Sequence, residues 1–443
     1  MTEPPLESVY SSVVSLRSLR IVIFLAELND LDIWGADVGN AYLEAKTKEK
    51  LFIVAGPEFG ELSGHILVIH KAIYGLRSSG LCYRERFADT LREMGFISSR
   101  ADPDVWMRKQ SGYYEYIAVY VDDLAIASKD PKAIVNSLTH DHKYKLKGVG
   151  PLTHHLGCDF ECDPDGTLRQ IPRKYITKIL DNYEKMFKEK PKEASSPLEK
   201  GDHPELDDTE LLESEGTTKF QSLIGSLQWL ITLGRFDVAT AVMTLSRFRA
   251  QPREGHLSRA KRVFGYVKKF KEGSIRIRTD IPDYSDLPSP VHSWDYSVCG
   301  NVKEEIPTDI PEALGKPVVL TSYVDANLYH DKITGRSMTG VIHLINQTPI
   351  DWYTKKQSTV ETATYGSEFS AARTAVEQII DLRTSLRYLG VPVQGKSYMF
   401  GDNESVVKSS TVPQSLLNKR HTALSYHRVR EAIAAGIVKP ILC

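Results

Sequence analysis

The segment YIAVYVDDLAIAS, residues 116–128, constrains the fold of this chain more than any other stretch. Apart from Ser128, its side chains have largely apolar bodies except at two adjacent carboxylates, Asp122 and Asp123. A run this rich in Val, Ile, Ala and Tyr predicts a buried strand or hairpin. Burying two neighbouring carboxylates costs free energy unless their charge is compensated. The segment therefore predicts a tight turn that brings both carboxylates into one cleft, where they bind a cation.

The best candidate for a third carboxylate is Asp37, at the end of a short strand-like run in WGADVGNAYLEA. Mg²⁺ binds to carboxylates together with substrate phosphates. Two such metals, bridged by aspartates, clamp the attacking and leaving oxygens of phosphoryl transfer. The alternative is structural, because an Asp–Asp pair alone is more often a turn and a lone Asp is more often a cap.

The composition is that of an ordinary globular protein, with 443 residues, 41% of them hydrophobic and 26% charged. This length predicts roughly two to four domains. The net charge of −1 predicts that a nucleic-acid partner would be bound through local patches. The odd number of five cysteines predicts a reducing, intracellular setting. The run IVIFLAEL is too short for a membrane span, which needs about 20 apolar residues.

Patterning along the chain predicts mixed helices and strands in the first part, with RERFADTLREMGF as a helix that ends at Gly95. Residues 191–217 are rich in Pro, Ser and acids and predict an exposed linker before helices over 218–271. A second irregular stretch covers 279–316. Strands, a helix over 366–389, a strand and a final helical region follow. We expect the major boundary between residues 272 and 317.

A second set of acids lies in this last part. Asp325 and Asp402 each end a predicted strand, and Glu368 opens the long predicted helix. Two strand-end acids and one helix acid can converge at a sheet edge and hold two metals. Taken singly, each has a structural explanation as a turn residue or as a helix-start Glu favoured by the helix dipole.

The segment SRAKRVFGYVKKFKEGSIRIR, residues 258–278, carries eight Lys and Arg against one acid. Its apolar residues form a stripe at helical spacing, and the basic residues, which include Lys268 and Lys269, lie largely off that stripe. This arrangement predicts a helix that follows the phosphates of a duplex. An ordinary solvated helix face is the alternative. The strand alternation in HHLGCDFEC makes a zinc site there a poor interpretation.

Several motifs together resemble one family. YVDD in an apolar hairpin, preceded by ADVGNAY, resembles the palm of reverse transcriptases. KAIYGLRSSGLCYRERFADTLREMGF and FQSLIGSLQWLITLGRFDVATAVMTLSRF resemble blocks of the copia-type LTR retrotransposon polymerases. SYVDANLYHDKITGRSMTG, WYTKKQSTVETATYGSEFSAA and GDNESVV resemble the ribonuclease H domain that follows those polymerases. The resemblance extends from about residue 12 to 437.

The resemblance implies an α+β polymerase palm with a helical thumb, followed by an α/β ribonuclease H-like domain. The implied organisation is a palm and start of the thumb over 1–190, an acidic linker over 191–217, a helical thumb or connection over 218–278, a linker over 279–316 and a ribonuclease H-like domain over 317–443. Family members carry finger strands upstream that grip the triphosphate. We expect these strands to be missing here, because only MTEPPLESVYSSVVSLRSLR precedes the first palm helix.

The resemblance also implies roles for single residues. Asp37, Asp122 and Asp123 become the polymerase metal ligands, and Asp325, Glu368 and Asp402 become those of the nuclease. Tyr42 matches the aromatic position that excludes a ribose 2′-OH, and Tyr120 matches the residue beside the primer end; for both, the alternative is a core Tyr. Gly75 lies in a turn near the template and the incoming nucleotide. Arg77 follows it, where Arg77, Ser78 and Ser79 replace the family's Lys-Gln run.

One nuclease acid is absent from the motif. Alignment on His421, Tyr426 and His427 places the fourth family acid at Ala423. The two histidines are candidates to act near the metals, with packing or surface roles as the alternative.

The implied function is RNA-directed DNA synthesis with degradation of the RNA strand of the hybrid, using Mg²⁺, with Mn²⁺ as a substitute. The implied partners are an RNA template, a DNA primer, an RNA–DNA hybrid and deoxynucleoside triphosphates, without a membrane. The implied location is intracellular, in the cytoplasm or a particle, with nuclear entry. The alternative is a decayed element product that binds nucleic acid without polymerising.

Overall fold

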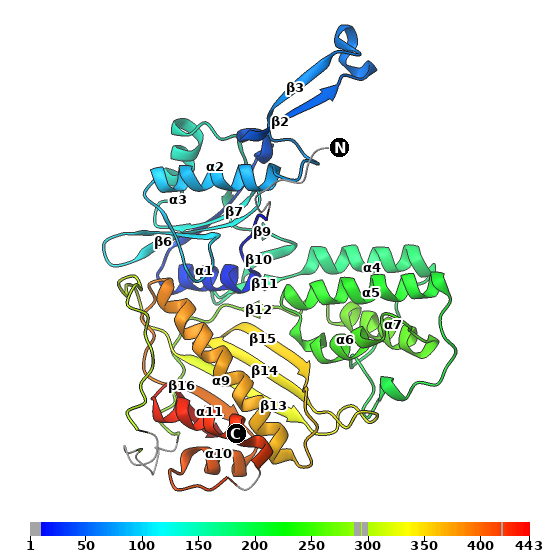
Figure 1. Ribbon diagram of the computed structural model, residues 1–443, viewed down its shortest axis with the longest axis vertical. Helices are drawn as coiled ribbons and strands as arrows, with labels where there is room; N and C mark the ends of the chain where they lie inside the picture. The colour runs from blue at the N-terminus through cyan, green and yellow to red at the C-terminus, as the bar shows by residue number, and fades with distance from the viewer. Residues whose placement is uncertain (1–9, 288–293, 295–299, 418–419) are drawn as a thin grey trace. The chain divides into compact units, whose positions relative to one another are not determined.

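The computed structural model describes residues 10–287, 294, 300–417 and 420–443 (Figure 1). Contacts divide the chain into two compact units, Met1–His155 and Leu156–Cys443. This division assigns residues 156–190 to the second unit. The expected boundary between residues 272 and 317 stays a prediction. Within the described residues, no helix combines the length and hydropathy that a bilayer crossing requires.

The first unit is built on a six-stranded sheet with the order β4-β5-β6-β7-β1-β8. Its strands are β1 (Asp32–Val38), β4 (Ile97–Ser98), β5 (Val105–Lys109), β6 (Tyr114–Tyr120), β7 (Asp123–Ser128) and β8 (Leu146–Pro151). Helices α2 (Ser79–Glu93) and α3 (Pro131–Asn136) cover one face, where Phe87, Leu91 and Ile134 share a core with Ile117 and Ile126. Helix α1 (Leu16–Leu28) contacts β1, β6 and β7 outside that core cluster, and it therefore lies on the other face.

The predicted α2 is confirmed, and it ends as expected near Gly95, whose positive φ of 84° favours glycine. A two-stranded ribbon of β2 (Lys46–Val54) and β3 (Ile66–Lys71) leaves the sheet between β1 and α2 (Figure 1). Short helical turns flank it: η1 (Ala41–Glu44) and η2 (Pro57–Leu62). The π-turn η3 (Ser137–Asp141) follows α3, and the two-residue strand β9 (His154–His155) ends the unit.

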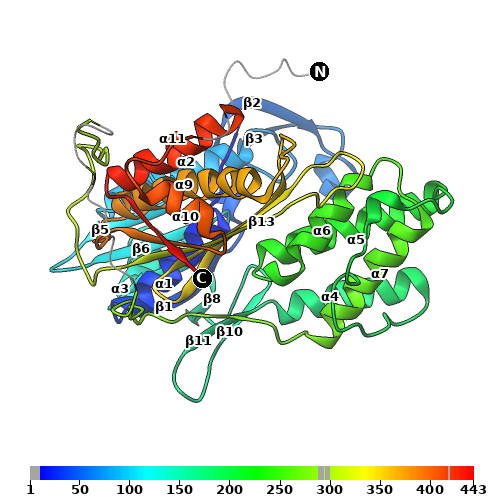
Figure 2. The same cartoon turned by 90° about the horizontal axis from the view of Figure 1, so that it is seen from below.

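The second unit begins with the antiparallel strands β10 (Cys158–Cys162), β11 (Leu168–Ile171) and β12 (Ile275–Arg276). Between β11 and β12 the chain forms a helical subdomain, visible as one bundle in Figure 2. It comprises α4 (Arg173–Phe187), η4 (Pro204–Leu206), α5 (Ser214–Thr232), η5 (Phe236–Val238), α6 (Ala239–Leu245), η6 (Ser246–Phe248) and α7 (Glu254–Lys269). Tyr183, Phe220, Val242 and Phe264 are buried together in its core, which explains the apolar spacing in the sequence.

Residues 189–207, which we call the acidic strap, run along α7. The backbone approach is close, because a Cβ at Gly265 would overlap the Lys192 carbonyl oxygen. Acids of the strap and of the β10–β11 turn form ion pairs with five of the eight basic residues of 258–278: Arg259, Lys261, Arg262, Lys268 and Arg276. Lys269 donates to the Ser195 hydroxyl at 2.8 Å. Many residues of the strap stay exposed while its acids pair with α7, so the basic helix face is largely neutralised within the molecule.

The carboxy-terminal part of this unit is an α/β domain around a five-stranded sheet with the order β15-β14-β13-β16-β17. Strands β13 (Leu320–Asn327), β14 (Met338–Ile345) and β15 (Thr348–Lys356) are antiparallel, whereas β16 (Ser397–Gly401) and β17 (Val438–Leu442) join in parallel. The long helix α9 (Thr364–Tyr388) lies on one face with α10 (Glu404–Thr411), η7 (Arg420–Thr422) and α11 (Ala423–Ala434) (Figure 1).

Two buried ion-pair groups connect other segments to this domain. Asp331, which is fully buried, pairs with Arg247 of the helical subdomain and with Lys356 of β15, the latter at 2.9 Å. Glu304, in the irregular 279–316 segment, pairs with Arg383 and Arg387 of α9, both at 2.7 Å. Because buried charges are stable only when they are paired, these contacts hold the helical subdomain and the described part of that segment against the sheet.

We expect Asp331→Asn to lower the free energy of unfolding of the second unit by about 3–5 kcal/mol, because the change leaves Arg247 and Lys356 without their shared anion. Urea unfolding measures this loss. The control is Glu215→Gln, which breaks an ion pair of an 82% exposed side chain with Lys219 and should cost about 0.5 kcal/mol or less. Equal losses in the two variants would contradict the structural role of Asp331.

Candidate functional site

The first carboxylate group lies where β1 meets the β6–β7 hairpin. Asp37 of β1 and Asp123 of β7 are direct cross-strand partners, so their side chains share one side of the sheet. Asp122 occupies the two-residue turn between β6 and β7, and its carbonyl accepts a hydrogen bond from Val38 N at 2.8 Å. Val121, before it, has φ of +57°, an unusual conformation for a β-branched residue and one that recurs at functional sites. The hairpin therefore places all three acids at one sheet end.

These carboxylates are half-buried. Burial first, then repulsion by Asp122 and Asp37, raise the pKa of Asp123 to about 6, against a smaller lowering effect of His154. Among the described residues none of the three acids forms a salt bridge with Lys or Arg, so no protein cation in that part of the chain pairs with them. Such uncompensated negative charge suits a divalent metal.

Four of the residues expected to bind substrate, Tyr42, Gly75, Arg77 and Tyr120, belong to the same unit as this group. The Tyr42 ring contacts Tyr74, with centroids 4.6 Å apart, and it also packs partly against the core. Tyr120 is the cross-strand partner of Asp123. Gly75 has φ of +96°, which explains a glycine in that turn, and Arg77 is exposed.

Sequence reasoning missed Tyr74, which precedes Gly75 and whose ring is 62% exposed. Desolvation, and then the charge of Asp122, raise the pKa of its phenol. Its one sequence signal was its place in the Tyr-Gly turn, directly before Gly75. Sequence reasoning also missed Lys147, the cross-strand partner of Asp37 on β8, for which no motif existed.

The three acids of the second group, Asp325, Glu368 and Asp402, lie closer to one another than those of the first group. Asp325 lies on the open face of β13, Asp402 directly follows β16, and Glu368 lies in the first turns of α9. One ligand oxygen from each can be chosen so that all three lie within 4.8 Å of one another. The amide of Ala326 donates to Glu368 Oε1 at 3.3 Å and orients this buried carboxyl. The first group does not meet the same distance criterion within the part of the chain that is described.

The second group is electrostatically strained without a cation. Burial, followed by repulsion from Asp325 and Asp402, raises the pKa of Glu368 to about 8. Burial and Asp402 also raise the pKa of Asp325. A carboxyl in this state binds a proton or a metal, because either one removes the repulsion. The donor set therefore fits a hard divalent cation such as Mg²⁺ or Mn²⁺.

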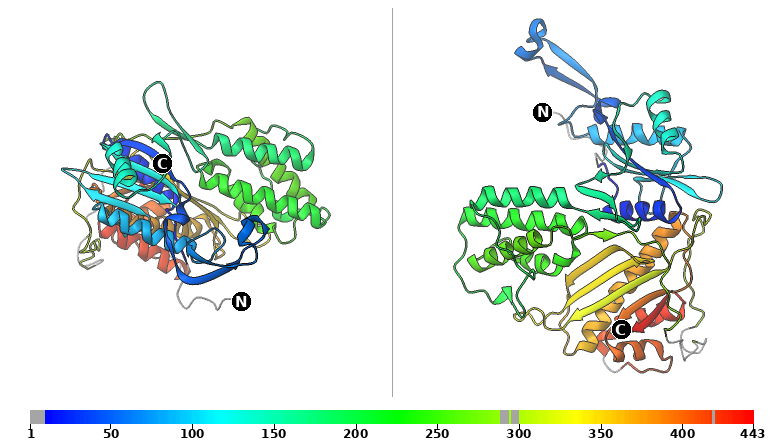
Figure 3. Two further views of the ribbon diagram at one scale, coloured as in Figure 1. Left: turned by 90° about the horizontal axis from the view of Figure 1, so that it is seen from above. Right: turned by 180° about the vertical axis from the view of Figure 1, so that it is seen from behind.

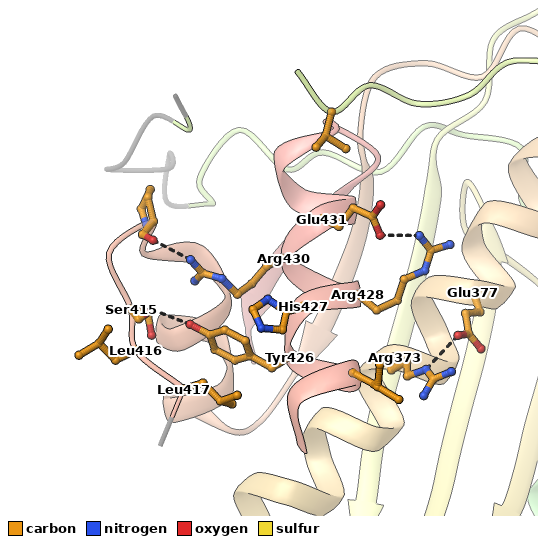
Figure 4. Close-up of a pocket in the computed structure, with 13 residues that line it drawn as sticks. Arg373, Glu377, Ser415, Leu416, Leu417, Tyr426, His427, Arg428, Arg430 and Glu431 are labelled. Atoms are coloured by element: carbon orange, nitrogen blue, oxygen red, sulfur yellow. Dashed lines mark hydrogen bonds and ion pairs between the residues drawn. The ribbon is translucent and has the colours of Figure 1, made fainter. Parts of the chain in front are cut away.

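Ala423, at the start of α11, contributes no carboxylate to this group. His421 Nε2 instead lies 2.9 Å from Oε2 of the buried Glu361, so its ring is held at the start of α9. His427 lines a different cavity, of about 960 Å³, beside Arg428 and Glu431 (Figure 4). No metal-group acid lines that cavity, so the structure does not support a role for His427 beside the metals.

We expect the metal-free protein to lose stability as pH rises from about 4.5 to about 8, because native Glu368 holds a proton in this range that the unfolded chain releases. Glu368→Gln should flatten this decline. Thermal unfolding midpoints in EDTA between pH 5 and pH 8 test it. The control is Glu377→Gln on the same helix, where Glu377 pairs with Arg373 at 2.9 Å. Parallel curves for the parent and Glu368→Gln would refute the electrostatic assignment.

Comparisons with known proteins agree with this geometry. Residues 3–194 match the family model described as reverse transcriptase (RNA-dependent DNA polymerase). The chain is 24% identical over 435 residues to the retrovirus-related Pol polyprotein from transposon RE1 of Arabidopsis thaliana, covering 98% of this chain and 27% of that protein. It is 24% identical over 442 residues to the polyprotein from transposon TNT 1-94 of Nicotiana tabacum, covering 96% and 30%. The chain thus spans about a quarter to a third of these relatives.

A transposon Ty5-1 protein of Saccharomyces cerevisiae is 27% identical over 330 residues, which cover 72% of this chain and 92% of that protein. Among solved structures, ribonuclease H1 of Halobacterium salinarum aligns with 29% of this chain and 86% of its own at 15% identity, with a TM-score of 0.21, too low to support a conclusion. The α/β arrangement and its acids agree by themselves with the ribonuclease H-like expectation. Residues 3–194 therefore match a reverse transcriptase family model, and the chain is similar over nearly its whole length to retrovirus-related Pol polyproteins from plant transposons.

Proposed function

We propose that this chain acts in retrotransposon replication by copying RNA into DNA and by degrading the RNA strand of the resulting hybrid. The observation that carries the proposal is the close grouping of Asp325, Glu368 and Asp402, within 4.8 Å, in a chain related to Pol polyproteins. Divalent metals bound to such carboxylates stabilise the attacking and leaving oxygens of phosphoryl transfer.

At the nuclease centre the three acids have different roles. Glu368 is buried and oriented by the Ala326 amide, so it is the fixed ligand. Asp325 and Asp402 are exposed at the sheet edge and can face both metal and substrate phosphate. Since Ala423 supplies no fourth carboxylate, one metal would be held firmly and the second weakly. The enzyme would then need high Mg²⁺ or prefer Mn²⁺.

At the polymerase centre Asp37, Asp122 and Asp123 would hold the metals that bind a deoxynucleoside triphosphate. Tyr120, opposite Asp123, would lie beside the DNA primer end. Tyr42, in contact with Tyr74, would exclude a ribose 2′-OH. Gly75 and Arg77 would contact the RNA template and the incoming nucleotide.

A second candidate is a protein that binds nucleic acid and cleaves hybrids without efficient polymerisation. The looser grouping of Asp37, Asp122 and Asp123 favours it, as does the run Arg77-Ser78-Ser79 in place of the family's Lys-Gln. Polymerisation requires a bound triphosphate, whereas hybrid cleavage requires only a bound duplex and metals. We therefore propose the nuclease as the stronger of the two activities.

For the nuclease, Asp325→Asn should reduce cleavage of the RNA strand of a labelled hybrid roughly 100-fold or more, the scale of losing one preorganised charged group. Ala423→Asp should lower the Mg²⁺ concentration that gives half-maximal cleavage, because it restores a fourth carboxylate. Ala423→Asn, of similar size but uncharged, is the matched control. A parent protein that leaves hybrid RNA intact in both Mg²⁺ and Mn²⁺ would sink the nuclease proposal.

For the polymerase, extension of a DNA primer on an RNA template should be slow in the parent and should fall by roughly 100-fold or more in Asp122→Asn. Asp130→Asn is the control, since Asp130 caps α3 away from the metal group. Undetectable extension by the parent, with intact cleavage, would favour the second candidate. Equal extension by the parent and Asp122→Asn would remove this aspartate from the metal site.

A further inference from the structure

A cavity of about 370 Å³ is lined by residues of the helical subdomain and of the sheet face opposite α9. Figure 3 (right) shows the helical subdomain beside β15 of that sheet. Its floor comes from β13, β14, β15 and β16, and one wall comes from η5 and α6. This volume is within the range of ligand-binding pockets, about 300–1,000 Å³. Asp325 and Asp402 line the same cavity, so it opens beside the nuclease acids.

Strand register places an aromatic row across the cavity floor. Trp352, Ile342 and Tyr323 are successive cross-strand partners, and Tyr323 is in register with Phe400. The Tyr323 and Phe400 rings are stacked, with centroids 5.1 Å apart, and Tyr323 is 45% exposed. Phe236 of the helical subdomain extends the row, because its ring centroid lies 5.0 Å from that of Trp352. Such a platform stacks a planar aromatic ligand.

The adjacent register row is polar and open. Thr354, Gly340 and Asp325 are successive cross-strand partners, two residues along from the aromatic row. A Cβ built on Gly340 meets no atom within 4 Å, so the floor is unfilled there. Thr354 Oγ1 is buried and has no hydrogen-bond partner among the described residues.

We propose that this cavity binds a nucleobase that has left the duplex stack, belonging to the nucleotide whose phosphate lies at Asp325 and Asp402. This inference rests on the proposed nuclease function. The aromatic row would stack the base, and Asp325 and Asp402 would hold a metal that binds the phosphate. An apolar protein side chain would fill only the aromatic row and would leave both acids unmatched.

A site for an unstacked base should favour substrates in which a base is already unpaired. Bases in a continuous hybrid are paired and stacked, and taking one out costs a few kcal/mol. A bulged or overhanging ribonucleotide avoids most of that cost. The site should therefore prefer hybrids with an unpaired ribonucleotide over fully paired hybrids. Phe236 of the helical subdomain is part of the aromatic row. The preference for an unpaired ribonucleotide should therefore require both the helical subdomain and the sheet.

The test uses the full chain with an RNA–DNA hybrid that carries one bulged 2-aminopurine ribonucleotide, in Ca²⁺ to suppress cleavage. We expect bound protein to quench 2-aminopurine fluorescence by stacking on the base. The protein should bind the bulged hybrid roughly five- to 100-fold more tightly than the same hybrid fully paired, the range expected for one base–aromatic stack. Gly340→Leu fills the floor and should abolish both the quenching and the preference. Gly340 lies in a strand, and the added Cβ has open space, so the fold should tolerate Leu.

Trp352→Leu is the second variant, and Trp229→Leu, a 36% exposed tryptophan outside the cavity, is its matched control. The thermal unfolding midpoint of each variant reports whether it is folded. Equal quenching in the parent and Gly340→Leu would overturn the inference, as would equal affinity for bulged and paired hybrids. The effect of Asp325→Asn on cleavage tests the nuclease separately. Quenching lost only in Gly340→Leu and Trp352→Leu supports the base site even if no metal gives cleavage.

Discussion

Repulsion between carboxylates is the constraint on which both sites depend. The chain places three acids at the end of the β1–β6–β7 sheet and three more at the edge of the β13–β16 sheet. In each case the backbone, and not a countercharge, holds the acids together: strand pairing fixes Asp37 opposite Asp123, and the Ala326 amide holds Glu368. Burial, and then that repulsion, raise the pKa values of Asp123 and Glu368. Acids that the folded chain holds close together despite their repulsion are typical of functional sites.

The second unit also depends on pairing opposite charges within itself. Asp331 joins the helical subdomain to the α/β domain, and the acidic strap neutralises much of α7. Phe236 of the helical subdomain also packs against Trp352, beside the cavity between η5 and the sheet. Because the acidic strap pairs with α7, phosphates that approach Lys268 must compete with Glu193, which lies 3.7 Å from it. Contacts of a nucleic acid with this helix would therefore require strap acids to release their partners.

The two carboxylate groups differ in how completely they are built. At the nuclease group, three ligand atoms already lie within 4.8 Å, and what is absent is the carboxylate that Ala423 does not supply. At the polymerase group, the third acid lies in a turn beside the strained Val121, so its carboxylate depends on a hairpin conformation. Fixed acids on strands and helices hold geometry better than acids in turns, which supports the proposal that the nuclease is the stronger activity.

The sequence by itself predicted the two groups of acids, the main helices and the α/β character of the carboxy-terminal part. These properties are local: Asp122 and Asp123 stand out in an apolar run, α2 shows its spacing and its terminal Gly95, and Asp325 and Asp402 each follow a strand pattern. Tertiary structure alone decided that the acidic strap lies on α7, that Asp331 is buried and that Trp352, Tyr323 and Phe400 form one row with Phe236. Each of these features joins residues far apart in the chain, and neither periodicity nor charge content specifies which surfaces meet. Strand register and the pairing of buried charges make that choice.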